Sequence, residues 1–188
     1  MLNFYPFKND KIESMSNNVI SNIRNDLGNK IDHFNSNNND FITVFSNISK
    51  ITDNIYLSGI YGADNIDKLN EYNIKCILNC TKNEPNVFEN NSDMTYMRIP
   101  VNDMGGQHIE QYFDSTYNFI EKCTSMNKNV LVHCHAGVSR SATILIAYFM
   151  RKNKISYQEA FDFVKSKRSI IGPNFDFRDA LRNYKPTY

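Results

Sequence analysis

Residues 130–143 read VLVHCHAGVSRSAT, and this stretch decides the fold of the chain. Its first three residues are apolar, which is typical of a short strand buried at the centre of a sheet. Small residues follow, and Gly137 among them can take a positive φ. A helix is expected to begin at about Ser141. The stretch therefore predicts a central strand that passes through a tight loop into a helix.

The loop in this stretch predicts a binding site for an oxyanion. Backbone N–H groups in a strand–loop–helix connection point inward, and the helix N-terminus adds partial positive charge. Arg140 can bind two phosphate oxygens with its planar guanidinium. Cys134 lies at the floor of the loop, where the same positive charges favour its thiolate, a nucleophile directed at phosphorus. The residues whose backbone we expect to bind the anion are His135, Ala136, Gly137, Val138 and Ser139.

Outward from this stretch, strand patterns alternate with helix patterns along the chain. The segment from Gly59 to Gly62 is interpreted as a turn. Such alternation predicts an α/β domain with a central, mostly parallel sheet of about five strands flanked by helices. Strands are expected at residues 41–45, 55–57, 74–78, 96–99 and 130–132, and helices at residues 65–72, 109–126, 141–152, 157–166 and 174–183.

The first 40 residues differ in composition from the rest and predict a separate N-terminal extension. Residues 12–27 place apolar side chains at helical spacing, and a polar, Asn-rich linker follows at residues 35–40. We therefore divide the chain into an extension, residues 1–40, and a main domain, residues 41–188. The amphipathic helix either covers one face of the main domain or serves as a lid or a homodimer contact.

Composition argues against several classes of protein. The 21 Lys and Arg nearly balance the 20 Asp and Glu, which argues against a nucleic-acid-binding protein. No apolar run reaches the roughly 18 residues of a membrane span, and no secretory signal is recognisable. Four cysteines do not suggest a disulfide framework. We expect a soluble protein of the reducing cytoplasm, without a membrane or nucleic-acid partner.

Residues 144–188 carry nine basic and four acidic side chains. Two interpretations of this surplus stay open: the basic residues lie on solvated helix faces, or they attract an anionic substrate. The residues concerned are Arg151, Lys152, Lys154, Lys165, Lys167 and Arg168.

The stretch around Cys134 resembles the cysteine-dependent protein phosphatases and, within them, the dual-specificity phosphatase family. Residues 147–150 and the segments 51–59 and 168–181 also resemble that family, so the resemblance covers about residues 48–185. It implies a protein-tyrosine-phosphatase-like fold, a small atypical member of the family, and residues 41–188 as its catalytic domain. The signature HCxAGxSRSxT is met at every fixed position: His133, Cys134, Ala136, Gly137, Ser139, Arg140, Ser141 and Thr143.

The resemblance also implies roles for residues around the nucleophile. Asp103, on a glycine-containing loop, would be the general acid; the alternatives are that it caps a helix or that Asp114 is the acid. Ser141 would assist departure of the thiolate, cap the helix, or do both. His133 would orient the loop, or is simply a buried histidine. Asn174 would buttress the loop, or belongs to an ordinary turn.

Two further predictions concern the cysteines and metal binding. Cys80 follows a strand expected beside residues 130–132, and its position resembles that of a resolving cysteine in some lipid-directed relatives. A reversible Cys80–Cys134 disulfide is therefore one hypothesis, and a small buried core residue is the other. His133, Cys134 and His135, together with Cys76 and Cys80, supply soft metal ligands. No second paired Cys/His cluster occurs at zinc spacing, so neither a metal nor another cofactor is expected.

The activity implied by the resemblance is hydrolysis of phosphotyrosine, phosphoserine and phosphothreonine in phosphoproteins through a phosphocysteine. One alternative is a non-protein substrate, such as an RNA 5′-phosphate, a phosphoinositide or a phosphoglycan. The loop positions His135, Ala136, Val138 and Ser139 offer no Lys, whereas lipid-directed relatives often have one there. A phospho-binding pseudophosphatase is a second alternative, although Cys134 and Arg140 are both present. A rhodanese-like or arsenate-reductase-like sulfur enzyme is a third, and it fits the flanking segments poorly.

Overall fold

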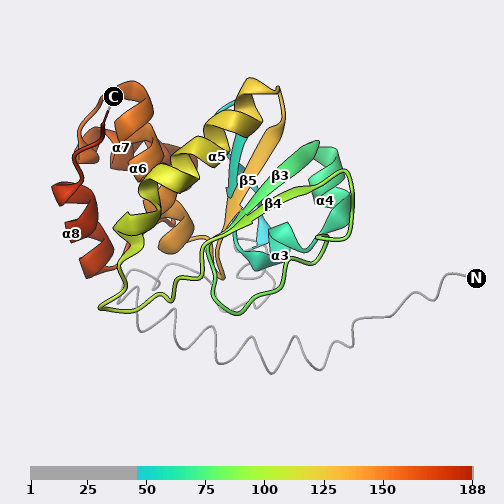
Figure 1. The fold of residues 1–188 in the computed structure, drawn as a ribbon, viewed down its shortest axis with the longest axis horizontal. Helices are drawn as coiled ribbons and strands as arrows, with labels where there is room; N and C mark the ends of the chain where they lie inside the picture. Colours follow the sequence, from blue (N-terminus) through green and yellow to red (C-terminus); the bar gives the residue numbers. More distant parts are fainter. Residues whose placement is uncertain (1–45, 188) are drawn as a thin grey trace, which may run out of the picture. The chain divides into compact units, whose positions relative to one another are not determined.

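A computed structural model describes residues 46–187 of the chain (Figure 1). The helix predicted at residues 12–27, the strand predicted at 41–45 and the proposed boundary after residue 40 lie outside these residues. The described part has a five-stranded sheet with helices on both of its faces. This arrangement confirms the predicted α/β class and the central sheet of about five strands.

The strands form one sheet in the order β1-β2-β5-β3-β4, with β5 at its centre. β1 pairs antiparallel with β2, whereas β5 pairs parallel with both β2 and β3, and β3 pairs parallel with β4. The sheet is therefore mostly parallel, as predicted. The bounds are β1 Ser49–Lys50, β2 Ile55–Ser58, β3 Ile74–Asn79, β4 Thr95–Arg98 and β5 Asn129–His133.

Two short elements differ from the sequence prediction. The edge strand β1 was not expected, and the segment interpreted as a turn contains the one-turn helix α3. The next helix, α4, has Asn65 as its N-cap, whose side chain accepts a hydrogen bond from the backbone N–H of Lys68. The helices are α3 Ile60–Ala63, α4 Ile66–Glu71, α5 Phe113–Ser125 preceded by the 3-10 turn η2 Ile109–Tyr112, α6 Arg140–Asn153, α7 Tyr157–Lys167 and α8 Phe175–Asn183.

Both faces of the sheet are buried, which explains the run of apolar residues at the middle of its central strand, β5. Val130 and Val132 of β5 belong to the core shared with α5, α6, α7 and α8, whereas Leu131 belongs to the core on the side of α3 and α4. Each of these three side chains is fully buried. Burial of one such side chain stabilises a fold by about 1.5–3 kcal/mol, so this short strand is fixed in its register.

The register of the sheet aligns the carboxyl ends of the central strands. His133 at the end of β5 lies opposite Ser58 at the end of β2 and opposite Asn79 at the end of β3. In open α/β sheets, ligand sites form beyond the carboxyl ends of the strands. The fold therefore places the loop after His133 where a ligand site is expected.

Candidate active site

Residues 134–139, here called the cysteine loop, connect β5 to α6. Gly137 lies at the middle of this loop with φ +68°, a conformation that L side chains rarely adopt. A Cβ at this position would lie 2.5–2.7 Å from the backbone of Ser58 and Gly59. Glycine is therefore required at position 137 for two separate reasons, its φ angle and its close packing against the end of β2.

In the cysteine loop, each backbone carbonyl from His135 to Ser139 accepts a hydrogen bond from the surrounding protein. The carbonyl of His135 accepts from Ile60 N, and that of Val138 accepts from Gly172 N. The carbonyls of Ala136 and Gly137 accept from the guanidinium of Arg168. The Ser139 carbonyl accepts from both the N–H and the hydroxyl of Thr143.

This pattern fixes the direction of the N–H groups in the loop. In a trans peptide unit the C=O and the N–H point in opposite directions. Because the carbonyls of this loop point toward the surrounding protein, the N–H groups of the same peptide units point toward the inside of the loop. Gly137 N donates to Cys134 Sγ at 3.3 Å, which shows this inward direction directly. The loop thus presents several N–H groups around one sulfur atom, which is the geometry of an anion-binding concavity.

Cys134 lies at the floor of this concavity. Cys134 is 1 % exposed, and its Sγ lies 3.2 Å from Ser141 Oγ in the first turn of α6. The α6 helix begins at Arg140, with Ser139 as the N-cap residue. The Ser141 hydroxyl is thus directed at the sulfur, and the cap position belongs to a different residue.

Arg168 supports the cysteine loop from beneath and was not identified as a site residue by sequence reasoning. It is 4 % exposed, so it does not belong to the basic surface group in which the sequence placed it. Besides the two loop carbonyls, its guanidinium donates to Asn47 O and Ser49 Oγ. Burial lowers its pKa to about 10, whereas the nearby Cys134 acts in the opposite direction. One signal in the sequence could have identified Arg168 as a site residue: it lies in segment 168–181, which resembles the dual-specificity phosphatase family.

Other members of that basic group lie on the surface and contact acidic residues of α5. Arg151 binds Asp114 at 2.9 Å and stacks over the ring of Tyr117. Lys152 binds Glu121. These contacts favour the interpretation of solvated helix faces for this part of α6. They also place Asp114, the rival candidate for the general acid, in an exposed ion pair.

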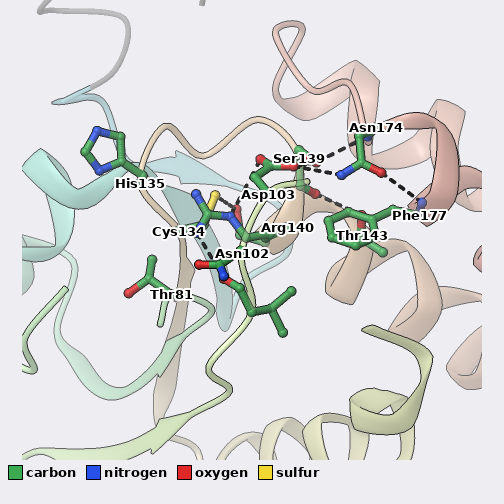
Figure 2. Close-up of polar contacts among 12 residues, drawn as sticks. Thr81, Asn102, Asp103, Cys134, His135, Ser139, Arg140, Thr143, Asn174 and Phe177 are labelled. Atoms are coloured by element: carbon green, nitrogen blue, oxygen red, sulfur yellow. Dashed lines mark hydrogen bonds and ion pairs between the residues drawn. The ribbon is translucent and has the colours of Figure 1, made fainter. Parts of the chain in front are cut away.

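Residues 100–106, here called the Asp103 loop, lie against the cysteine loop. Arg140 contacts the Asp103 loop twice: its Nη1 donates to Val101 O at 3.2 Å, and its Nε lies 3.6 Å from Asp103 Oδ2. Ser139 Oγ donates to Asp103 Oδ1 at 2.7 Å. The carboxyl group of Asp103 is therefore held beside the cysteine loop by residues of that loop and of α6 (Figure 2).

Asn174, the N-cap of α8, binds both loops. Its side-chain Nδ2 donates to Asp103 Oδ1 at 2.9 Å, and its backbone N–H donates to Ser139 Oγ at 3.2 Å. Its Oδ1 accepts from Phe177 N and so caps the helix. The two interpretations given to Asn174 from the sequence are thus compatible, because one side chain caps α8 and contacts the Asp103 loop.

His135 lies on the opposite side of Cys134 from Asn174 (Figure 2). Its Nδ1 lies 3.0 Å from Glu84 Oε1, and both side chains are partly exposed. The neighbouring His133 is buried instead, and burial lowers its pKa to about 4. His133 is therefore neutral at neutral pH, and His135 lies at the rim of the site.

The register of β3 and β5 places Cys80 close to Cys134. The N–H of Cys80 donates to His133 O at 2.8 Å. Cys80 is the first residue after β3, as Cys134 is the first residue after β5, and the two strand ends lie side by side. Cys80 is fully buried, and this burial raises the pKa of its thiol. All four cysteines of the chain are free thiols. Cys76 and Cys123 are buried in the core, as predicted.

Residues 46–187 hold neither a group of metal ligands nor a membrane-spanning helix. In this part of the chain no three His, Cys, Asp or Glu side chains are grouped so that they could hold a metal ion. Within the same residues no helix combines the length and apolar character needed to cross a membrane.

Comparison with protein families and curated proteins gives consistent matches. The family model for the dual specificity phosphatase catalytic domain matches residues 55–187. Dual specificity protein phosphatase 7 of Homo sapiens is 44% identical over 133 residues, which cover 71% of this chain and 32% of that protein. Dual specificity protein phosphatase 6 of Mus musculus is 43% identical over 133 residues, which cover 71% of this chain and 35% of that protein. The chain thus spans about a third of the length of these relatives.

Solved structures with the same fold agree with this result. The crystal structure of DUSP15 superposes with a TM-score of 0.68 at 32% identity, covering 72% of this chain and 85% of that chain. The human tyrosine phosphatase-like serine/threonine/tyrosine-interacting protein superposes with a TM-score of 0.65 at 28% identity, covering 73% of this chain and 94% of that chain.

Proposed function

The chain belongs to the dual-specificity phosphatase catalytic-domain family, and from this premise we propose that it hydrolyses phosphotyrosine, phosphoserine and phosphothreonine in proteins. One observation carries the proposal. The sulfur of Cys134 lies at the floor of a loop whose N–H groups face it, and the carboxyl group of Asp103 is bound to Ser139 of the same loop. A nucleophile and an acid are thereby both held beside one anion site.

In the first step Cys134 attacks phosphorus as a thiolate. The S–P bond forms while the bond between phosphorus and the substrate oxygen breaks. The inward N–H groups of the loop and the guanidinium of Arg140 bind the phosphoryl oxygens. The departing oxygen takes a proton from Asp103, so that it leaves as a neutral hydroxyl. Such general acid catalysis contributes roughly 10²–10⁴-fold.

The hydrogen bonds of Asp103 indicate which oxygen carries this proton. Oδ1 accepts from Ser139 Oγ and from Asn174 Nδ2. Oδ2 has Arg140 Nε at 3.6 Å, which is beyond hydrogen-bond distance. Because both donors occupy Oδ1, the acidic proton resides on Oδ2. The fixed Oδ1 orients the carboxyl group, and Oδ2 reacts.

In the second step water hydrolyses the phosphocysteine. Asp103, now a carboxylate, takes a proton from the water as its oxygen attacks phosphorus. The S–P bond breaks, the sulfur leaves as a thiolate, and inorganic phosphate is released. The hydroxyl of Ser141, 3.2 Å from the sulfur, stabilises the negative charge that returns to Cys134. The proposed steps use only protein groups and water.

The test compares Cys134→Ser with Cys123→Ala, a variant of another buried thiol, on para-nitrophenyl phosphate. Cys134→Ser should lose at least about 10³-fold in kcat, because the nucleophile is replaced by a hydroxyl that is hardly ionised. Cys123→Ala should keep wild-type turnover per folded molecule. Acid quenching of Asp103→Asn during turnover should trap a phosphorylated Cys134, detected by mass spectrometry. Full turnover by Cys134→Ser would overturn the mechanism.

A substrate panel distinguishes proteins from the alternative substrates. We expect doubly phosphorylated peptides to be hydrolysed with a higher kcat/KM than phosphoinositides or RNA 5′-phosphates, because the loop positions 135–139 carry no Lys to bind additional phosphates. A preference for either of the other classes would replace the protein-phosphatase proposal. Binding of phosphopeptides without turnover by the wild-type chain would instead indicate a pseudophosphatase.

Reversible oxidation of Cys134 is a second proposal for this site. The thiolate reduces hydrogen peroxide, which yields a sulfenic acid and hydroxide; the thiol of Cys80 then attacks that sulfur and water is released. The adjacent ends of β3 and β5 support this pairing. Peptide mapping after mild peroxide treatment should detect a Cys80–Cys134 disulfide. Conversion of Cys134 to a sulfinic acid without that link would contradict the proposal.

The homodimer stays a prediction, since the helix at residues 12–27 that would form its contact lies outside the described residues. The cytoplasmic location also stays a prediction. Light scattering of the full chain and of an Ile20→Glu variant tests the homodimer. A dimer that the substitution dissociates would support it, and a wild-type monomer at micromolar concentration would contradict it. Microscopy of the tagged full chain tests the location.

A further inference from the structure

The Asp103 loop has a second attachment to α8, at a residue with no part in the proposed chemistry. The backbone N–H of Gly106 donates to Asp176 Oδ2 at 2.8 Å. The two residues lie 70 positions apart in the sequence. A charged acceptor makes this one of the stronger types of hydrogen bond. It links the far end of the loop to the first turn of the helix.

The packing at Gly105 supports the same attachment. A Cβ added at Gly105 would lie 3.2 Å from Asp176 Oδ2, so the carboxylate lies directly against the backbone of the loop. Gly106 takes φ +74°, a value that glycine adopts without strain. The backbone at these two glycines is therefore shaped to receive the carboxylate of Asp176.

One turn of α8 thus holds the Asp103 loop at two points. Asn174 binds the carboxyl group of Asp103 itself. Asp176, two residues further along, binds the backbone three residues after Asp103. The first contact orients the side chain, whereas the second fixes the course of the main chain that carries it.

This second contact is exposed to solvent. Gly106 and Asp176 are both exposed, and both line a groove of about 510 Å³ between residues 106–110 and the α8 region. A hydrogen bond in this position contributes little to global stability, since water can replace either partner. Its effect on geometry is larger, because a displacement of about 1 Å at a catalytic group can reduce a rate roughly 10²-fold.

We propose that Asp176 is a positioning residue for the reaction, which holds the Asp103 loop so that Oδ2 of Asp103 reaches the departing oxygen of the substrate. This inference rests on the proposed function, namely on Asp103 as the general acid. Asp176 touches neither substrate nor reacting atoms. It acts through the backbone of Gly106.

The proposal predicts a dependence on the leaving group. A poor leaving group such as phenolate requires protonation, whereas 2,4-dinitrophenolate departs without it. Asp176→Ala should therefore lower kcat for phenyl phosphate about tenfold and change kcat for 2,4-dinitrophenyl phosphate less than twofold. General damage to the site would lower both rates by the same factor.

Two further variants separate the hydrogen bond from other effects. Asp176→Asn keeps an acceptor oxygen for Gly106 N and should recover most of the rate on phenyl phosphate. Asp179→Ala removes a carboxylate that lines the same groove, and in the described part of the chain its side chain makes no hydrogen bond to the Asp103 loop. This control should behave as the wild type on both substrates.

Equal losses on both substrates in Asp176→Ala, or no recovery in Asp176→Asn, would overturn the proposal. Asp103→Asn is measured in parallel to separate this result from the proposed function. If Asp103→Asn shows the leaving-group dependence and Asp176→Ala does not, the positioning role alone is wrong. If Asp103→Asn shows no such dependence, the acid is another residue and the inference fails together with that assignment.

Discussion

The cysteine loop and the Asp103 loop contact one another, yet they are held in different ways. The carbonyls of the cysteine loop are bound by backbone groups and by the buried guanidinium of Arg168. The Asp103 loop is held mainly by side chains, among them Ser139 of the cysteine loop and Asn174 and Asp176 of α8. The first loop is therefore part of the folded core, and the second is attached to it.

This difference indicates how mutations should act in each region. A change in the cysteine loop should reduce stability and activity together, because the same hydrogen bonds serve both. A change at the attachments of the Asp103 loop should reduce activity and leave stability nearly unchanged. Three predictions test this division, and each of them could break it; a fourth concerns His133, which immediately precedes the cysteine loop.

The largest effect is expected for Gly137→Ala. A Cβ at this position meets the backbone of Ser58 and Gly59 at 2.5–2.7 Å, and the positive φ adds strain. We expect the free energy of unfolding in urea to fall by about 3 kcal/mol. The kcat on an aryl phosphate should fall about 10²-fold or more, because the N–H groups of the loop move.

Gly172→Ala is the matched control for this prediction. Nothing lies within 4 Å of a Cβ at Gly172, and its N–H to Val138 O is retained. Its stability should stay within about 0.5 kcal/mol of the wild type. Equal effects of the two alanines would show that the shape of the cysteine loop does not depend on Gly137.

A smaller effect is expected for Arg168→Met, which keeps much of the side-chain length and removes the donors. The carbonyls of Ala136 and Gly137 then lose their partners inside the protein, and we expect a loss of about 2 kcal/mol in stability. Activity should fall as well. Arg178→Met, at an exposed site on α8, should leave both quantities unchanged. A stable but inactive Arg168→Met would contradict the coupling proposed for this loop.

The Asp103 loop is tested by Asn174→Ser. Serine is an equally good N-cap, so the free energy of unfolding should change by less than about 0.5 kcal/mol. The shorter side chain no longer reaches Asp103 Oδ1, which Asn174 Nδ2 binds at 2.9 Å. We expect kcat for phenyl phosphate to fall about tenfold, or about 1.4 kcal/mol in the barrier. A loss of stability as large as that of Arg168→Met would erase the distinction between the two loops.

The smallest effect is a dependence of stability on pH through His133. Its folded-state pKa is about 4, whereas an unfolded histidine has a pKa of about 6.5. As pH falls below 6.5 the unfolded chain takes up a proton that the folded protein does not, so stability decreases until pH reaches about 4. Between pH 7.5 and 5.5 this loss amounts to about 1 kcal/mol.

Urea unfolding of His133→Gln at the two pH values checks this prediction, because the variant lacks that part of the slope. His108→Gln, at an exposed position immediately before η2, should keep the wild-type slope. The same slope in all three proteins would show that His133 does not carry the dependence.

The sequence predicted the elements that are buried on both faces. Residues 55–57, 74–78 and 130–132 were expected as strands, and the structure has β2, β3 and β5 there with ends that differ by one residue. Mostly apolar runs of this kind result from the packing of helices on both sides of a parallel sheet. The pattern is thus a direct product of the environment of these strands.

Short elements carry no such pattern and were missed. β1 has two residues, one of them Lys50, and pairs only at the edge of the sheet. α3 has four residues with Gly62 among them, and glycine in a short segment is more typical of a turn. The conformation of both elements is set by neighbours distant in sequence.

The residues of the candidate site also divide into those that the sequence could predict and those that it could not. The geometry of Cys134, Gly137 and Ser141 could be anticipated because one strand–loop–helix segment contains them all. Arg168 could not, since a charged residue is normally placed on the surface and its burial depends on carbonyls 31 and 32 positions away. The contact between Gly106 and Asp176 likewise depends on how α8 packs.

The carbonyls of residues 135–139 point away from the anion site, and this has a consequence for ligand binding. Protein groups already satisfy them, so the cysteine loop is preorganised and its conformational entropy is lost during folding rather than at the encounter with an anion. Association of vanadate or phosphate should therefore be a single fast phase whose rate rises linearly with concentration, without a slow isomerisation afterwards. The same rigidity would restrict the loop to tetrahedral anions of one size.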